Sequence, residues 1–172
     1  MIRPSPFVFT TVQLGSHTNL IQLLAACLLL LLTSCGPTVL YEKVTPTETD
    51  QGWAYTDTLS FQFTVTDNQQ LYDMELVVQH SEEFAYENFY LNIHTTGPNG
   101  IRTTERISLD LSGEFGAWNG DCSGGRCELA VPVLQRTRFQ EVGDYELVLE
   151  QNSRDNPLAA IQAMGVRVVE VE

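Results

Sequence analysis

The chain has 172 residues, of which 9 are Lys or Arg and 22 are Asp or Glu. All the acidic residues follow Cys35, together with only eight of the basic ones, so the chain after this cysteine is strongly acidic. Nucleic-acid binding needs Lys and Arg to neutralise phosphates, and a polybasic membrane surface needs the same residues. The charge therefore argues against both classes of protein, and we expect no nucleic-acid partner.

A short apolar run near the start of the chain predicts an export signal. Residues 23–32 are all apolar, but this run is too short to span a bilayer, which takes about 20 residues. It ends in Leu32-Thr33-Ser34-Cys35, which matches the lipobox of bacterial lipoproteins. We therefore predict a lipoprotein signal peptide over residues 1–34 and acyl chains, such as palmitate, on Cys35. An ordinary signal peptide, or a buried helix with a chance cysteine, is the alternative.

The rest of the chain divides into a linking segment and one domain. Residues 35–50 contain two prolines and four threonines with little periodicity, so they are predicted to form the acylated cysteine and a tether. At about 3.3 Å per extended residue, this tether could separate the domain from the membrane by several tens of ångströms. Residues 51–172 are enough for one domain with one core.

Alternation of apolar and polar residues with a period of two predicts strands over most of this domain. The runs with this pattern are 59–66, 72–78, 89–94, 103–111, 129–139, 145–149 and 166–171. Gly97-Pro98-Asn99-Gly100 predicts a tight hairpin turn, because Asn-Gly accepts positive φ. Pro132 predicts an edge strand or a bulge, because proline cannot donate a hydrogen bond to the ladder.

These elements together predict the fold class. Residues 158–164 are predicted to form a helical turn or a loop, and no long helical pattern is present. Seven to nine short strands without a long helix predict an all-β fold, a single antiparallel β-sandwich. Both an immunoglobulin-like and a jelly-roll-like topology are compatible with the pattern.

Two cysteines of the domain, Cys122 and Cys127, are separated by four residues that include Gly124-Gly125. An exported chain meets an oxidising compartment, where such a pair can form a disulfide. Because the closed loop is short, the entropic stabilisation is about 2 kcal/mol at best. Two free thiols remain the alternative. A zinc site is disfavoured, because no histidine or second cysteine pair lies nearby in sequence.

Little in the chain points to catalysis, and no enzymatic activity, cofactor or metal site is predicted. After Cys35 there are two histidines, His80 and His94, and no G-x-S-x-G, H-E-x-x-H or P-loop motif. His94 falls on the polar face of its strand, where a solvated side chain is expected. Acidic loop residues could bind Ca²⁺, but Asp67, Asp73, Glu82 and Glu83 show no ordered ligand spacing.

Aromatic residues offer a second kind of site. The six that stand out are Trp53, Tyr55, Tyr72, Tyr86, Tyr90 and Trp118. Exposed aromatics anchor protein interfaces, and they also stack on sugars, whereas buried ones simply belong to the core. Asp57-Thr58-Leu59 also resembles the short O-glycosylation sequon used on exported proteins of the Bacteroidota, which makes Thr58 a candidate acceptor.

Short motifs then follow one another in a recognisable order. The first are Val39-Leu40-Tyr41-Glu42, Trp53, Leu59-Ser60-Phe61-Gln62-Phe63, Tyr86-Glu87-Asn88-Phe89-Tyr90-Leu91 and Gly97-Pro98-Asn99-Gly100. The later ones are Phe139, Gly143, Tyr145, Glu150-Gln151, Arg154, Leu158, Ile161 and Gly165-Val166-Arg167. With Leu32-Thr33-Ser34-Cys35 before them, they resemble the GldH family of gliding-motility lipoproteins of the Bacteroidota. The loop of Cys122 and Cys127 differs from the Gly- and charge-rich loop usual in that family.

The resemblance implies a non-enzymatic envelope lipoprotein that supports a gliding-motility apparatus and the protein secretion linked to it. Its partners would be the membrane, through acyl chains on Cys35, and other envelope proteins of that assembly. A glycan- or Ca²⁺-binding sandwich is the alternative function. Gly36 follows the cysteine without an acidic run, so we expect the periplasmic face of the outer membrane, with the inner membrane as the second choice.

Overall fold

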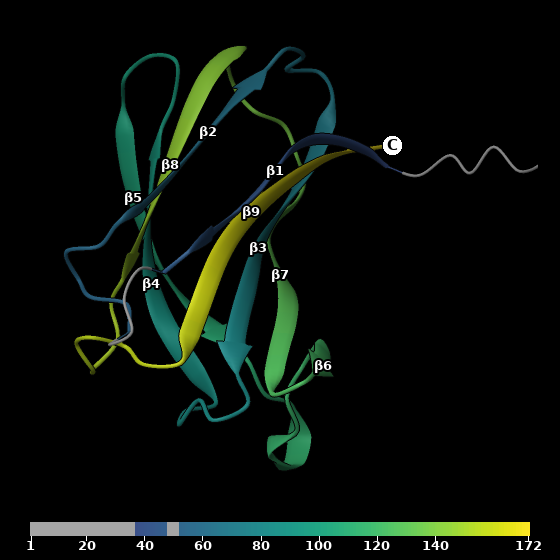
Figure 1. Ribbon diagram of the computed structural model, residues 1–172. Helices are drawn as coiled ribbons and strands as arrows, with labels where there is room; N and C mark the ends of the chain where they lie inside the picture. Colours follow the sequence, from purple (N-terminus) through teal and green to yellow (C-terminus); the bar gives the residue numbers. More distant parts are fainter. Residues whose placement is uncertain (1–36, 48–51) are drawn as a thin grey trace, which may run out of the picture. The chain divides into compact units, whose positions relative to one another are not determined.

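The computed structural model describes residues 37–47 and 52–172, which form nine strands in two antiparallel sheets (Figure 1). The first sheet has the order β1 (Thr38–Pro46), β9 (Ile161–Val171), β3 (Leu71–Ser81), β7 (Arg126–Thr137) and β6 (Asp121–Ser123). The second has the order β2 (Leu59–Val65), β8 (Gly143–Gln151), β4 (Asn88–Thr96) and β5 (Arg102–Asp110). One 3₁₀ turn covers Glu114–Gly116. The predicted signal peptide and Cys35 lie outside the described residues.

The order of the strands decides between the two expected topologies. Every connection crosses from one sheet to the other, except the β4–β5 hairpin and the short β6–β7 turn. In an immunoglobulin fold, three pairs of consecutive strands stay within one sheet. The orders β1-β9-β3-β7 and β2-β8-β4-β5 instead describe a jelly roll of eight strands, with β6 added at one edge. The prediction of an all-β antiparallel sandwich is therefore confirmed.

The core lies between the sheets and follows from the alternation of the strands. In β2, Leu59, Phe61, Phe63 and Val65 are buried while the residues between them are exposed. The inner faces of β4 and β8 contribute Phe89, Leu91, Leu147 and Leu149 to the same cluster. Trp53, which precedes β2, is completely buried and pairs with Leu158 through two backbone hydrogen bonds. This pair connects the β1–β2 and β8–β9 segments.

The tether predicted over residues 35–50 is wrong for residues 38–46, which form β1. These residues pair with β9 from Thr38↔Glu170 to Pro46↔Ala163, and Leu40 and Tyr41 pack against the core. The prolines were misleading because Pro37 precedes the strand and Pro46 is its last residue, positions where the ladder tolerates a missing donor. Only Gly36 and Pro37 then separate Cys35 from the strand, so about 11 Å of extended chain links Cys35 to Thr38.

Strand β9 begins earlier than the sequence pattern indicated. Residues 158–164 were expected to form a loop or helical turn, but residues 161–164 already belong to β9 and pair with β1 and β3. Ala163-Met164-Gly165-Val166 is buried without alternation, because β9 lies between two strands inside its sheet. A fully buried strand has no period-two signal, so this stretch resembled a short apolar loop.

The sandwich has two ends that differ in what they carry. Because Thr38 pairs with Glu170, the start of β1 and the end of β9 lie together (Figure 1). We call this the anchor end; its loops are 66–70, 97–101 and 138–142. The opposite, distal end carries the connections 52–58, 82–87, 111–120 and 152–160. In the described part of the chain, no helix is long and apolar enough to cross a membrane.

Candidate binding groove at the distal end

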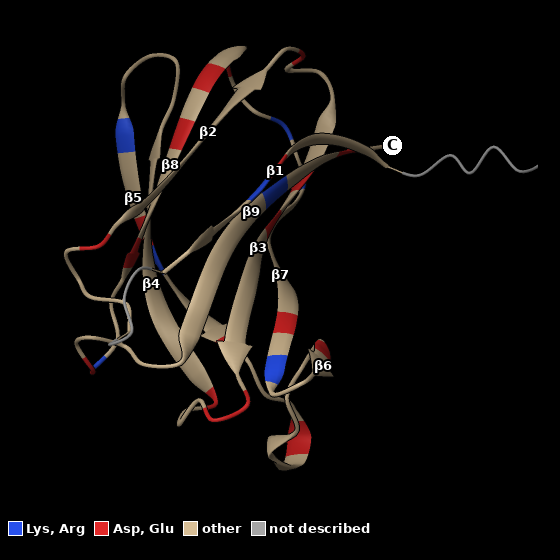
Figure 2. Ribbon diagram, in the orientation of Figure 1, with Lys and Arg blue, Asp and Glu red and all other residues tan. Residues whose placement is uncertain are grey.

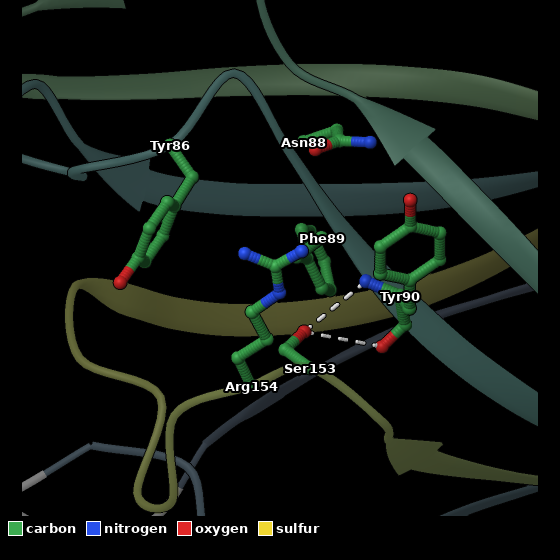
Figure 3. Close-up of a pocket in the computed structure, with 6 residues that line it drawn as sticks. All are labelled: Tyr86, Asn88, Phe89, Tyr90, Ser153 and Arg154. Carbon is green, nitrogen blue, oxygen red and sulfur yellow. Dashed lines mark hydrogen bonds between the residues drawn. The ribbon is translucent and has the colours of Figure 1, made fainter.

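A groove on the distal half of the second sheet brings together residues from two distant segments (Figure 3). Its first part has a volume of about 190 Å³ and is lined by Tyr86, Asn88, Phe89, Tyr90, Ser153 and Arg154. A second hollow of about 390 Å³ shares Tyr90, Ser153 and Arg154 and adds Arg106 and Asn152. We call these eight residues the distal groove.

Hydrogen bonds hold the β8–β9 connection against β4. The backbone N–H of Tyr90 donates to Ser153 Oγ over 3.1 Å, and the backbone N–H of Asn152 donates to the carbonyl of Tyr90 over 2.8 Å. The side-chain amide of Asn152 donates to Asn92 Oδ1 over 2.8 Å. The wall formed by Asn152 and Ser153 is therefore positioned by the sheet itself, rather than by the loop alone.

Two tyrosines present their rings at this surface. The side chains of Tyr86 and Tyr90 are 44% and 39% exposed. The hydroxyl of Tyr86 donates to Asp155 Oδ2 over 2.6 Å, and this bond to a carboxylate raises the pKa of Tyr86. The Tyr86 ring also packs edge-on against Phe84, with centroids 5.7 Å apart. The Tyr86 ring is therefore held in place, while both tyrosines stay partly exposed to a ligand.

The groove also concentrates positive charge in an acidic domain. Figure 2 shows basic residues at only a few positions of the sheets and loops. The guanidinium of Arg106 lies 4.8 Å from the centroid of the Tyr90 ring, and Figure 3 shows Arg154 extending between Tyr86 and Tyr90. Within residues 37–47 and 52–172, His94 and Arg167 are the only basic side chains that form ion pairs. Arg106 and Arg154 therefore keep their donors available for an acceptor such as a carboxylate.

The six aromatics singled out in the sequence divide between core and surface. Trp53 and Tyr72 are fully buried, and Trp118 packs beside the core against His80, with ring centroids 4.8 Å apart. Tyr55, Tyr86 and Tyr90 are exposed. The structure thus assigns half of this set to packing, and it brings two of the remaining three into one groove.

The two histidines lie in different environments. His80 is buried, and its Nδ1 lies 2.9 Å from the carbonyl of Ser81. His94 Nε2 lies 2.9 Å from Glu150 Oε2, and its Nδ1 lies 2.8 Å from Thr104 Oγ1. The solvated side chain expected for His94 is instead tied into a cross-strand network on the outer face of the second sheet.

This hydroxyl–imidazole–carboxylate series was not recognised in the sequence, because its members come from β4, β5 and β8. Since a carboxylate only accepts, the Nε2–H of His94 donates to Glu150, while its Nδ1 lies within hydrogen-bond distance of the Thr104 hydroxyl. Neither Thr104 nor His94 lines the distal groove. A network on a flat sheet face stabilises strand pairing, as cross-strand pairs do elsewhere.

The acidic residues considered for Ca²⁺ do not meet. Asp67 and Asp73 lie at the anchor end, where each accepts a backbone N–H, from Gln69 and Arg136 respectively. Glu82 and Glu83 follow β3 at the distal end. Thr58 is exposed immediately before β2, so the glycosylation proposed there would meet no steric barrier from the described residues.

The paired cysteines are joined by a disulfide in the structure, in the turn between β6 and β7. Glu82 has a carboxylate oxygen within 4.8 Å of both sulfurs. In the described residues, these three side chains are the only group of three potential metal ligands that lie this close together. A disulfide leaves neither sulfur as a thiolate, so this cluster lacks the ligands that zinc requires.

Replacing Cys122 and Cys127 together with serine is expected to lower the free energy of unfolding by about 2 kcal/mol, because the closed loop is short. Urea denaturation of the oxidised protein and of the double variant measures this difference. Intact mass after alkylation without reduction provides the control. Alkylation of either thiol in the native chain would show that the bridge does not form.

Fold and groove define the class of this molecule as a β-sandwich domain with a preformed surface groove. The chain belongs to the GldH lipoprotein family, whose model matches residues 39–168. It is 22% identical over 128 residues to a gliding motility lipoprotein GldH homolog of Christiangramia forsetii, covering 74% of this chain and 77% of that relative. The family inferred from the motif order is therefore confirmed.

Solved structures show only distant likeness. A chain of the infectious bursal disease virus VP2 subviral particle aligns with 12% identity and a TM-score of 0.35, over 77% of this chain and 30% of that one. Dimeric latent PorU from Porphyromonas gingivalis aligns with 12% identity and a TM-score of 0.28, over 81% of this chain and 14% of that one. The present chain spans less than a third of either.

Proposed function

We propose that this lipoprotein is a non-enzymatic accessory component of a gliding-motility apparatus and of the protein secretion linked to it, and that it binds other envelope proteins. The observation that carries the proposal is the distal groove, in which Tyr86, Tyr90, Arg106 and Arg154 remain available for contacts. Exposed tyrosine and arginine are the residue types that most often dominate protein interfaces. The groove also lies at the end of the sandwich away from the segment that leads to Cys35.

The same proposal places the chain at the membrane through acyl chains on Cys35. The match to a lipoprotein family supports an anchored envelope protein. Gly36 and the absence of an acidic run after it favour the periplasmic face of the outer membrane, with the inner membrane as the second choice.

A glycan ligand is the second candidate, because two tyrosine rings beside Asn88, Ser153 and Asn152 could also stack on and bond to a sugar. Ca²⁺ has less support, since the acidic residues proposed for it lie at opposite ends of β3. A glycan array probed with the purified chain distinguishes glycan binding from protein binding. Saturable binding that Tyr90→Ala removes would favour the glycan.

Spreading of cells on agar tests the protein-binding function. In a deletion strain, the double variant Tyr90→Ala/Arg154→Glu should fail to restore spreading and adhesin secretion, because it removes an anchor ring and reverses a groove charge. Arg126→Glu makes the same charge change outside the groove and should restore both. Each protein is first checked for equal abundance and unchanged Tm. Normal spreading with the double variant would count against this function.

A further inference from the structure

We propose that β5 is the docking site for an extended segment of a partner protein, which adds a strand to the second sheet. The proposal rests on the protein-binding function above and specifies the chemistry of the partner. Three observations carry it: the regular free edge of β5, the apolar cleft beside that edge, and the charges on its two sides.

Strand β5 has the longest regular free edge among the described strands. It pairs with β4 alone, through nine consecutive residue pairs from Asn88↔Asp110 to Thr96↔Arg102 without a register shift. By contrast, β1 carries a bulge between Val39 and Tyr41, and β7 carries Pro132 with two register shifts. Bulges, prolines and inward-pointing charges all protect edge strands from added strands. Strand β5 has no bulge or proline, and its charge on the cleft side is Glu105. Strand β2, at the other edge of this sheet, is also regular but contacts β1.

The hydrogen bonds at both ends of the hairpin show which groups of β5 are free. The N–H of Gly97 donates to Ile101, and the N–H of Leu111 donates to Glu87. Because bonded pairs alternate in an antiparallel ladder, the residues with odd numbers between these points bond to β4. Thr104, Arg106 and Ser108 consequently direct their backbone N–H and C=O groups away from the sheet, where a partner strand would meet them.

Beside this edge, the two sheets leave an apolar cleft of about 280 Å³. Ile107 and Leu109 line it from β5, and Val131, Val133 and Leu134 line it from β7. Strands β1 and β2 contact each other at the other side of the sandwich, so that side is closed. An added strand would place every second side chain into the cleft and would extend the core.

Charge defines the partner further. Glu105 lines the cleft and has no ion pair among the described residues, so a basic side chain fits opposite it. On the outer face, Arg106 belongs to the distal groove, so an acidic side chain fits there. The occupant is therefore an extended segment with apolar residues and one basic residue on one face, and acidic residues on the other. A second copy fits less well, because both copies carry the same large excess of acidic residues.

The test uses proline at residues whose N–H the fold does not use. Thr104→Pro and Ser108→Pro remove a free donor from the edge without removing a β4–β5 bond. Thr104→Ala and Ser108→Ala are the matched controls, because they lose the same side-chain hydroxyls. The full lipoprotein in detergent is applied to an array of ten-residue peptides that tile the envelope proteins of the host. A central proline in each positive peptide provides the reverse control.

We expect the wild type and the alanine variants to bind the same alternating peptides, and the proline variants to lose at least tenfold in affinity. Equal binding by the proline variants, or no bound peptide for the wild type, would overturn the inference. A dimer that the proline variants abolish would identify a second copy instead, and binding restricted to acidic glycans would exclude a peptide. If Thr104→Pro restores spreading while Tyr90→Ala/Arg154→Glu does not, this inference fails and the protein-binding function stands.

Discussion

Replacing Trp53 with alanine is expected to lower the free energy of unfolding by about 4 kcal/mol, the cost typical of removing a buried aromatic ring. The side chain is 0% exposed, and its Nε1–H donates to the carbonyl of Asp57. The variant would leave a cavity and would remove the donor to the half-buried carbonyl of Asp57. The backbone hydrogen bonds between residues 53 and 158 would remain, but the ring that packs between the β1–β2 and β8–β9 connections would be lost. Urea denaturation, monitored by tyrosine fluorescence and circular dichroism, gives the difference in the free energy of unfolding.

Phe115→Ala is the matched control for this loss. Phe115 is also aromatic and also lies in a distal connection, but its side chain is fully exposed. Its replacement should change the free energy of unfolding by less than about 0.5 kcal/mol, as for most surface positions. A loss below about 1.5 kcal/mol for Trp53→Ala would mean that the segment before β2 does not belong to the cooperative core.

Cys35→Ala is expected to abolish the incorporation of an alkyne-tagged fatty acid into the chain and to stop removal of residues 1–34. Acylation of this thiol is the proposed anchor, and at about 0.8 kcal/mol per buried CH₂, two or three chains are needed for stable attachment. Fluorescent labelling of the tagged acid, together with intact mass, measures both effects. A labelled and processed variant would refute the assignment of the lipobox.

Cys27→Ala provides the control, because Cys27 lies within the predicted signal and should not carry a lipid. This variant should label and mature like the wild type. The same labelled cells also test the proposed membrane face. Protease added to intact cells should leave the domain uncut if it lies in the periplasm, whereas rapid cleavage would place it on the cell surface.

Strands with one buried face were predictable from the sequence, and the others were not. In β2 and β8 the residues facing the core are apolar and their neighbours are polar, so period-two alternation is visible. Residues 163–166 of β9 are buried without alternation, and β1 follows Pro37 and ends in Pro46, so neither gave that signal. The jelly-roll order could not be read, because alternation does not encode which sheet a strand joins.

The distal groove shows a similar division. Tyr86 and Tyr90 were recognisable as candidate contact residues, because aromatics are common at interfaces. Their neighbours Ser153 and Arg154 lie more than 60 residues further along the chain and reach the groove only through hydrogen bonds between the β8–β9 connection and β4. No local pattern predicts such a meeting. The free edge of β5 likewise depends on strand order, which only the folded structure reveals.

Pairing of β1 with β9 has a mechanical consequence for a protein held at Cys35. Strand β1 runs from the anchor end toward the distal end, and its ladder to β9 spans Thr38 to Pro46. Ladder hydrogen bonds lie across the strands, so tension between the lipid and a partner at the distal end would load all of them at once in shear. Peeling them one after another would require a pull from the other end of β1. Attachment through Cys35, as proposed, would therefore load this ladder in its stronger geometry.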